Sequence, residues 1–198
     1  MLQEKLRDYR IILASQSPRR QMLLAGLDLK FEIIPREVEE VFPAELKREE
    51  IVLHLCRLKA DAFHESEMDD KTLILTADTI VWLNDHVLGK PSSREDAIDM
   101  LKQISGNKHI VYTGVCIKTK HKSAVFFAQS EVTFRELNEK EITWYVDNYS
   151  PMDKAGAYGI QEWIGYVGIQ RIEGSYYNVM GLPTQKLYVE LTKFLEEK

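Results

Sequence analysis

The most constraining feature of the sequence is an apolar run from Leu73 to Leu83, LILTADTIVWL, which one acidic residue interrupts. Its β-branched residues favour a buried strand over a helix. Asn84 and Asp85 tolerate the positive φ angles of a two-residue turn, and residues 86–88 can pair back as the return strand. The sequence therefore predicts a β-hairpin around which the rest of the chain is arranged.

The acidic residue in this run, Asp78, needs an explanation. An ionised carboxylate in such a strand costs about several kcal/mol unless it is paired, bound to a metal or open to a cleft. A structural salt bridge and a functional site explain Asp78 equally well when the run is taken alone. The motifs elsewhere in the chain must decide between them.

Composition bounds the class of protein. The 198 residues are long enough to bury a core, and 44% hydrophobic with 29% charged residues is typical of a globular protein. The net charge of −5 does not support general binding to nucleic acid. No segment resembles a signal peptide or reaches transmembrane length. Cys56 and Cys116 lie far apart without metal-ligand spacing, so we expect packed thiols in the cytoplasm and no membrane partner.

A candidate anion site follows the first expected strand, residues 11–14. Ser17 is a good helix N-cap, and Pro18 suits the first helical position. Arg19 and Arg20 then fall in the first turn, where the helix dipole disfavours positive charge. Two solvated arginines are the simpler alternative. The strand, the serine and the arginine pair together favour a phosphate bound at this helix N-terminus.

Periodicity and capping signals predict the remaining elements. They are strands over residues 31–35, 109–120, 124–137 and 166–172, and helices over residues 49–64 and 93–104, after Asn138, and from Pro183. Ser92 and Glu95 are expected to form the capping box of the second of these helices, and Asn138 and Glu141 are expected to cap the third. Lys59 adjoins the apolar face of the first, so its ammonium can reach a cleft. No linker appears, so we expect a single α/β domain over residues 1–198.

Six motifs in chain order resemble those of the Maf family. They are LASQSPRR (13–20), TADTIV (76–81), GKP (89–91), YTGV (112–115), DKAGAYGIQ (153–161) and GSYYNVMGLP (174–183). The resemblance spans nearly the whole chain. It implies a nucleoside triphosphate pyrophosphatase whose elongated mixed β-sheet carries flanking helices in two lobes around a central cleft. It also suggests a homodimer.

The resemblance also implies roles for individual residues. Asp78 corresponds to the catalytic carboxylate. The resemblance also places six residues around the triphosphate and its metal: Ser17, Arg19, Arg20, Glu39, Lys59 and Lys90. Arg19, Thr79 and Gln161 match the residues that distinguish the dTTP/UTP-type enzymes of the family. The chain departs from the pattern at Glu162, where a glycine commonly follows the glutamine.

The implied reaction is hydrolysis between the α- and β-phosphates. Hard oxygen ligands from Asp78 and Glu39 suit Mg²⁺ or Mn²⁺ as the divalent cofactor. Asp78 can serve as general base, as metal ligand or as both. Two other functions compete with this one: nucleotidyl transfer, which usually needs a glycine-rich first loop, and a cell-division regulator that acts as an interaction module.

Overall fold

The predicted hairpin is present in the computed structural model, which describes residues 1–197. Strand β3 spans Thr72–Leu83 and pairs antiparallel with β4, His86–Leu88, with Trp82 opposite Val87. Asn84 and Asp85 both have positive φ angles, 50° and 61°. A tight two-residue hairpin requires positive φ at both central positions, so the turn prediction is confirmed together with the strand.

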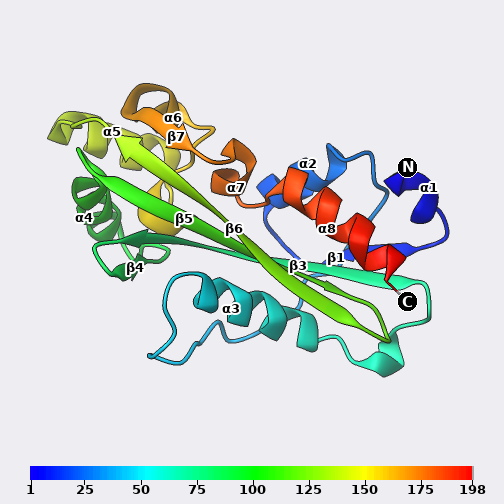
Figure 1. Ribbon diagram of the computed structural model, residues 1–198. Helices are drawn as coiled ribbons and strands as arrows, with labels where there is room; N and C mark the ends of the chain where they lie inside the picture. The colour runs from blue at the N-terminus through cyan, green and yellow to red at the C-terminus, as the bar shows by residue number, and fades with distance from the viewer. Residues whose placement is uncertain (198) are drawn as a thin grey trace. The chain divides into compact units, whose positions relative to one another are not determined.

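The strands of the described residues form one mixed sheet in the order β2-β1-β3-β5-β6-β7, with β4 paired to β3 outside this path (Figure 1). The remaining strands are β1 (Arg10–Leu13), β2 (Glu32–Ile33), β5 (Lys108–Lys118), β6 (Ser123–Phe134) and β7 (Ile169–Glu173). β1 is parallel to β2 and β3, whereas β7 is antiparallel to β6. The predicted mixed α/β sheet is thereby confirmed.

The chain divides into two compact units. The first comprises Met1–Asp78, Thr113–Ala128 and the residues from Gly181 onward, and the second comprises Thr79–Tyr112 and Gln129–Met180. Strands β3, β5 and β6 each have residues in both units, because the boundaries fall inside these strands. Neither unit is therefore a separate segment of the chain.

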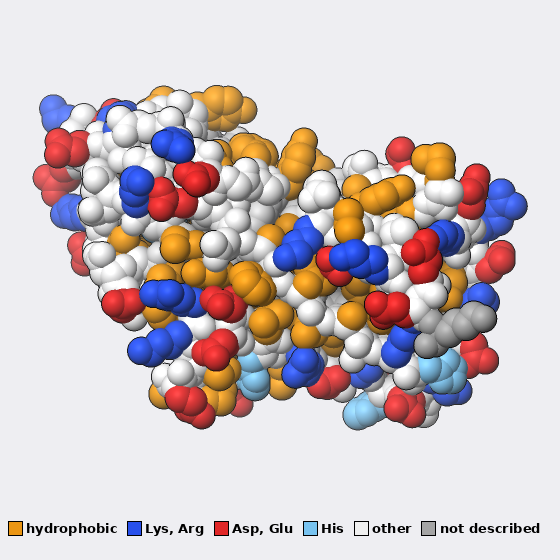
Figure 2. Space-filling view, viewed as in Figure 1, with side chains coloured by type: hydrophobic (Ala, Val, Ile, Leu, Met, Phe, Trp, Pro, Cys, Tyr) orange, Lys and Arg blue, Asp and Glu red, His pale blue; other side chains and the backbone are white. Residues whose placement is uncertain are grey.

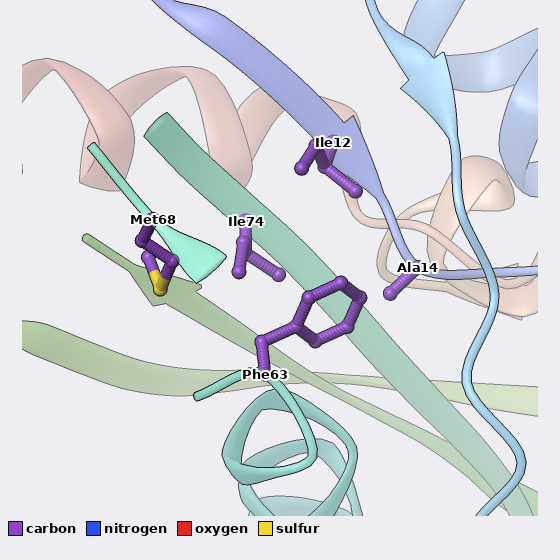
Figure 3. Close-up of a cluster of buried hydrophobic side chains, with 5 residues drawn as sticks. All are labelled: Ile12, Ala14, Phe63, Met68 and Ile74. Atoms are coloured by element: carbon purple, nitrogen blue, oxygen red, sulfur yellow. The ribbon is translucent and has the colours of Figure 1, made fainter. Parts of the chain in front are cut away.

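The first unit packs helices on its strands (Figure 1). Its helices are α1 (Leu2–Lys5), α2 (Pro18–Ala25), α3 (Glu49–Asp61), the single turn η1 (Glu65–Glu67) and α8 (Thr184–Glu196). Part of its core is a buried cluster in which Ile12, Ala14 and Ile74 from the β1 and β3 segments meet Phe63 and Met68 (Figure 3). Phe63 and Met68 lie in the segment that follows α3, so this segment is packed against the sheet.

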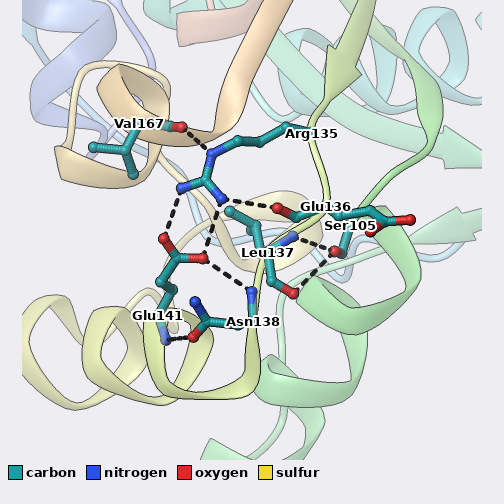
Figure 4. Close-up of polar contacts among 7 residues, drawn as sticks. All are labelled: Ser105, Arg135, Glu136, Leu137, Asn138, Glu141 and Val167. Atoms are coloured by element: carbon teal, nitrogen blue, oxygen red, sulfur yellow. Dashed lines mark hydrogen bonds and ion pairs between the residues drawn. The ribbon is translucent and has the colours of Figure 1, made fainter.

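The second unit contains α4 (Arg94–Ile104), α5 (Glu139–Tyr149), the turn η2 (Ala155–Ala157), α6 (Trp163–Gly168) and α7 (Tyr176–Met180). Arg135, just after β6, connects two of these helices (Figure 4). Its guanidinium binds Glu141 through Nη2 at 2.7 Å and donates from Nε to the Val167 carbonyl at 2.6 Å. Asn138 and Glu141 form the predicted capping box of α5.

The predicted cap of α4 and the predicted start of the last strand were wrong. The cap of α4 is Ser93, whose Oγ accepts from Asp96 N at 3.1 Å, one residue later than the predicted pair of Ser92 and Glu95. Residues 166–168 belong to helix α6 rather than to a strand, because Gly165 N turns back to Glu162 O at 2.9 Å. Two adjacent serines are equally plausible caps in the sequence, so the pattern does not show which of them caps α4. The alternating apolar residues after 165 fit a strand as well as a short helix, so they do not show where α6 ends.

The surface carries charges of both signs. On the face shown in Figure 2, acidic and basic side chains are interspersed, and no broad field of one sign covers it. Among the described residues, no helix is both long and apolar enough to cross a lipid bilayer.

Candidate active site

Asp78 is buried in β3, with 6% of its surface exposed, and it is the last residue of the first unit's opening segment. Lys59, in the last turn of α3, donates from Nζ to Asp78 Oδ1. The same Nζ lies 2.9 Å from Glu40 Oε1. The structure thus brings together two of the predicted site residues, and the buried carboxylate is matched by a largely buried ammonium.

Lys59 reaches Asp78 because α3 lies unusually close to the sheet. A Cβ atom at Gly114, in β5, would lie only 2.4 Å from the carbonyl oxygen of Val52 in α3. From β3, Thr76 donates through Oγ1 to the carbonyl of Cys56 at 2.5 Å. Glycine in the YTGV motif therefore has a packing reason, since it lets the helix that carries Lys59 approach the strand that carries Asp78.

Arg20 belongs to the same unit and makes hydrogen bonds through both its main-chain N–H and its guanidinium. Its N–H donates to Oγ of the N-cap Ser17 at 3.5 Å, and its Nε donates to the carbonyl of Gly181 at 2.9 Å. Gly181 has a φ angle of 120°, a conformation that favours glycine. Burial lowers the pKa of Arg20, and the negative charge of Asp78 opposes that shift.

Arg19 adds a second guanidinium in the first turn of α2. Its positive charge also lowers the pKa of Arg20, so the two groups are electrostatically coupled. No acidic residue occupies this first turn. The first unit therefore combines Arg19, Arg20 and Lys59 with one buried carboxylate, a set of groups suited to binding a polyanion beside a proton acceptor.

In the acidic stretch of residues 37–40, the carboxylate that reaches Lys59 belongs to Glu40 and not to the predicted metal ligand Glu39. Glu39 is exposed, and its neighbour Glu40 makes the ion pair. Sequence reasoning passed over Glu40 because the segment has no regular structure, so no periodicity indicates which acid turns inward. The only sequence signal for Glu40 was its place beside Glu39 in this acidic stretch. The role predicted for Glu39 stays a prediction.

A divalent ion is compatible with these groups. Within residues 1–197, no three His, Cys, Asp or Glu side chains converge into a ready protein-only metal site. Mg²⁺ in nucleotide enzymes usually binds through one or two carboxylates, with waters and substrate phosphates as the other ligands. Asp78 and a carboxylate from the acidic stretch fit that smaller donor set.

The other predicted residues, Thr79, Lys90 and Gln161, belong to the second unit. The GKP turn meets the DKAGAYGIQ loop there, since Gly156 N donates to the Gly89 carbonyl at 3.0 Å. Oε1 of Gln161 is buried and accepts no hydrogen bond from the described residues. A separate pocket of about 290 Å³, lined largely by α6 and β7, contains none of the predicted site residues.

Comparison with known proteins finds relatives that match almost the full length of this chain. The chain is 52% identical over 192 residues to the dTTP/UTP pyrophosphatase of Parabacteroides distasonis, covering 96% of this chain and 99% of that one. It is 54% identical over 187 residues to the dTTP/UTP pyrophosphatase of Bacteroides thetaiotaomicron, covering 93% and 96%. A solved structure, the Staphylococcus aureus Ham1 protein, matches with a TM-score of 0.43 at 16% identity over 63% of this chain and 71% of that chain, too weak a likeness to support a conclusion.

The family described as Maf-like protein matches residues 10–194, which is nearly all of the chain. This range contains each of the six motifs and every predicted site residue. The chain is a member of the Maf-like protein family.

Proposed function

We propose that the protein is a nucleoside triphosphate pyrophosphatase that acts on dTTP and UTP and releases pyrophosphate and the nucleoside monophosphate. The observation that carries the proposal is the buried Asp78 carboxylate, which accepts a hydrogen bond from Lys59 and whose negative charge acts on the Arg20 guanidinium. The relatives of similar length, named dTTP/UTP pyrophosphatases, support the same reaction class.

The proposed roles follow the chemistry of the side chains. Hydrolysis needs water at the α-phosphorus and stabilisation of the charge that develops on the departing pyrophosphate. Arg19, Arg20 and Lys59 are the proposed clamp for that charge, and such electrostatic stabilisation is usually the largest catalytic term. Asp78 is proposed to accept the proton of the attacking water. Ser17 and Lys90 are proposed to bind the phosphates, as the family resemblance implies.

Asp78 and Glu39 are the proposed holders of a divalent ion such as Mg²⁺ or Mn²⁺, with Glu40 as the neighbouring carboxylate. When bound, such an ion polarises phosphoryl oxygens and lowers the pKa of water. Lys59 supplies a positive charge beside the buried Asp78 carboxylate, and a buried charge of this kind needs such a partner.

Base selection is assigned to Arg19, Thr79 and Gln161. Gln161 Oε1 is buried and accepts no hydrogen bond from the described residues, which supports this role. The imide N–H of thymine or uracil could donate to this oxygen. A site built on hydrogen bonds discriminates strongly, because a mismatched base leaves buried polar groups unpaired. We therefore expect dTTP and UTP to be hydrolysed much faster than CTP, GTP or 7-methyl-GTP.

The test is kcat/KM for these five nucleotides with Mg²⁺ or Mn²⁺, with pyrophosphate measured directly, on wild type and on Gln161→Glu. The variant replaces an amide donor with a second acceptor, so it should penalise dTTP and UTP. Equal values across the wild-type substrates, or a preference for 7-methyl-GTP, would refute the specificity while leaving the reaction class intact. Pyrophosphate release only with a second substrate would indicate a nucleotidyl transferase instead.

A further inference from the structure

Glu162 is held by two partners in the interior of the second unit. Its Oε1 lies 3.1 Å from Nζ of Lys154, and its Oε2 accepts a hydrogen bond from the hydroxyl of Tyr145. Lys154 is 7% exposed and also pairs with Asp153 at 2.7 Å. An unpaired buried ammonium is costly, so Lys154 depends on these carboxylates. Glu162 is thus a fixed structural contact rather than a solvated loop residue.

The Tyr145 hydroxyl fixes both ends of the turn over residues 159–162. It donates to Glu162 and accepts from Gly159 N at 3.0 Å, while Glu162 N donates to the Gly159 carbonyl at 3.0 Å. Burial raises the pKa of Tyr145, and the hydrogen bond to Glu162 raises it further, so the phenol keeps the proton that it donates. Helix α5 therefore holds the turn through one side chain.

Gln161 lies within this turn. A Cβ atom at Gly159 would come within 2.8 Å of Glu162 Cδ and 3.0 Å of Gln161 Nε2, so both side chains pack over the same glycine. The position of the Gln161 amide is therefore linked to that of the Glu162 carboxylate. Gln161 Oε1 is buried without a donor in the described chain, and a buried acceptor left without a hydrogen bond is destabilising.

We propose that Glu162, fixed by Tyr145 and Lys154, is a positioning residue that sets where the Gln161 carbonyl oxygen meets the base. This inference rests on the proposed function, and it adds a specificity determinant outside the residues that touch the nucleotide. Thymine and uracil carry an N–H at N3, whereas cytosine has an acceptor there. A displaced Gln161 should therefore lose its preference for dTTP over dCTP.

The experiment measures kcat/KM for dTTP and dCTP, together with the melting temperature, for Tyr145→Phe, Glu162→Ala and Glu162→Gln. We expect Tyr145→Phe and Glu162→Ala to lower the dTTP-to-dCTP ratio by about tenfold or more, the effect of losing one buried hydrogen bond. Glu162→Gln keeps an acceptor for Tyr145 and should retain more of the ratio. Glu95→Gln, at a side chain that is 76% exposed on α4, is the matched control and should leave it unchanged.

A second series repeats these changes in a Gln161→Ala background, where a residue that acts through Gln161 should have no further effect on the ratio. An unchanged ratio in Tyr145→Phe and Glu162→Ala, with only a lower melting temperature, would overturn the inference and leave a structural role. If Glu162→Ala fails to fold, Tyr145→Phe decides, because it keeps the ion pair with Lys154. If Gln161→Ala alone leaves the ratio at its wild-type value, the inference fails while hydrolysis of dTTP stands. If wild type releases no pyrophosphate from any nucleotide, the proposed function fails as well.

Discussion

At Asp78, a carboxylate is kept inside an apolar strand by the ammonium of Lys59. A purely structural salt bridge would look the same, because breaking a buried pair exposes an uncompensated charge in either case. A structural role and a catalytic role for Asp78 predict different effects on turnover when its charge is removed and its shape is kept. The nearby guanidinium of Arg20 favours the functional one, since a structural pair needs no third charge.

Asp78→Asn should keep the fold and lose most of the turnover. A general acid–base contribution alone is typically worth ~10²–10⁴-fold, because the amide can no longer accept the proton of the attacking water. Steady-state pyrophosphate release and a melting curve measure the two effects. Asp70→Asn, at an exposed carboxylate paired with His121, is the control for loss of one negative charge. Near-normal turnover in Asp78→Asn would exclude this residue from the mechanism.

Glu39→Gln should raise the Mg²⁺ concentration needed for half-maximal rate by about tenfold or more, the order expected when a group that supports a metal site is lost. Glu40→Gln is the matched comparison, because it removes the ion-pair partner of Lys59 one residue along the same segment. A titration with Mg²⁺ separates the two. If Glu40→Gln shifts the requirement and Glu39→Gln does not, the predicted metal ligand is off by one position.

Motifs in the sequence indicate which residues to examine as a candidate site, but they do not predict the contacts that those residues make. The sequence pointed to Lys59 and Asp78 through an apolar helix face and an interrupted strand. The carbonyl of Gly181 and the carboxylate of Glu40 escaped notice for a physical reason. A backbone acceptor has no side-chain signature, and an irregular segment has no period that orients its acids.

At the scale of elements, prediction succeeded where local chemistry decides. The Asn84–Asp85 turn and the Asn138–Glu141 capping box are set by neighbours in sequence, and both are present. Helix α3 ends at Asp61, three residues before its predicted end at His64. The close approach of α3 to the sheet depends on Gly114 and Val52, far apart in the chain, and no local pattern encodes it.

Thr76→Val should lower the free energy of unfolding by about 1 kcal/mol, the net value of a typical hydrogen bond, because the Cys56 carbonyl loses its donor from β3. Valine matches the shape of threonine, so little packing changes. Thr76→Ser keeps the hydroxyl and should stay closer to wild type. Urea denaturation measures both, and a larger loss for serine than for valine would show that the methyl group matters more than the hydrogen bond.

At the scale of the whole molecule, two compact units are built from interleaved segments of one chain. Because β3, β5 and β6 each contribute to both units, a break within any of these strands would damage both cores. The expectation of a single domain over residues 1–198 stays a prediction. It implies one cooperative unfolding transition, with the same midpoint by near-UV and far-UV signals.

Stability should fall as the pH drops from about 6.5 toward 4, and His109 should cause much of that fall. Burial lowers the pKa of this histidine to about 4, and its Nε2 lies 2.7 Å from the hydroxyl of Tyr158. Since the unfolded chain binds the proton near pH 6.5, the neutral side chain contributes its full stability above that value. The loss should approach roughly 3 kcal/mol, at 1.36 kcal/mol per pKa unit.

Urea denaturation of wild type and His109→Gln between pH 7.5 and 4.5 checks this expectation. The variant should show a flatter dependence over that window, whatever its stability at pH 7.5. Glu141, whose pKa the Arg135 guanidinium lowers, loses its contribution only as the pH falls below the ordinary range of a carboxyl group, so it does not obscure the result. Identical slopes for the two proteins would assign the pH dependence to other groups.

The close contact at Gly114 limits which substitutions evolution can combine. The atom that a larger residue at 114 would strike belongs to the main chain of residue 52, and every amino acid carries that same carbonyl. Trimming the side chain at 52 therefore makes no room, and no paired replacement can rescue an alanine at 114. At Gly89 an added Cβ meets nothing within 4 Å, so that glycine is free of this constraint. In descendants of this sequence, position 114 should change only together with a shift of the entire helix α3.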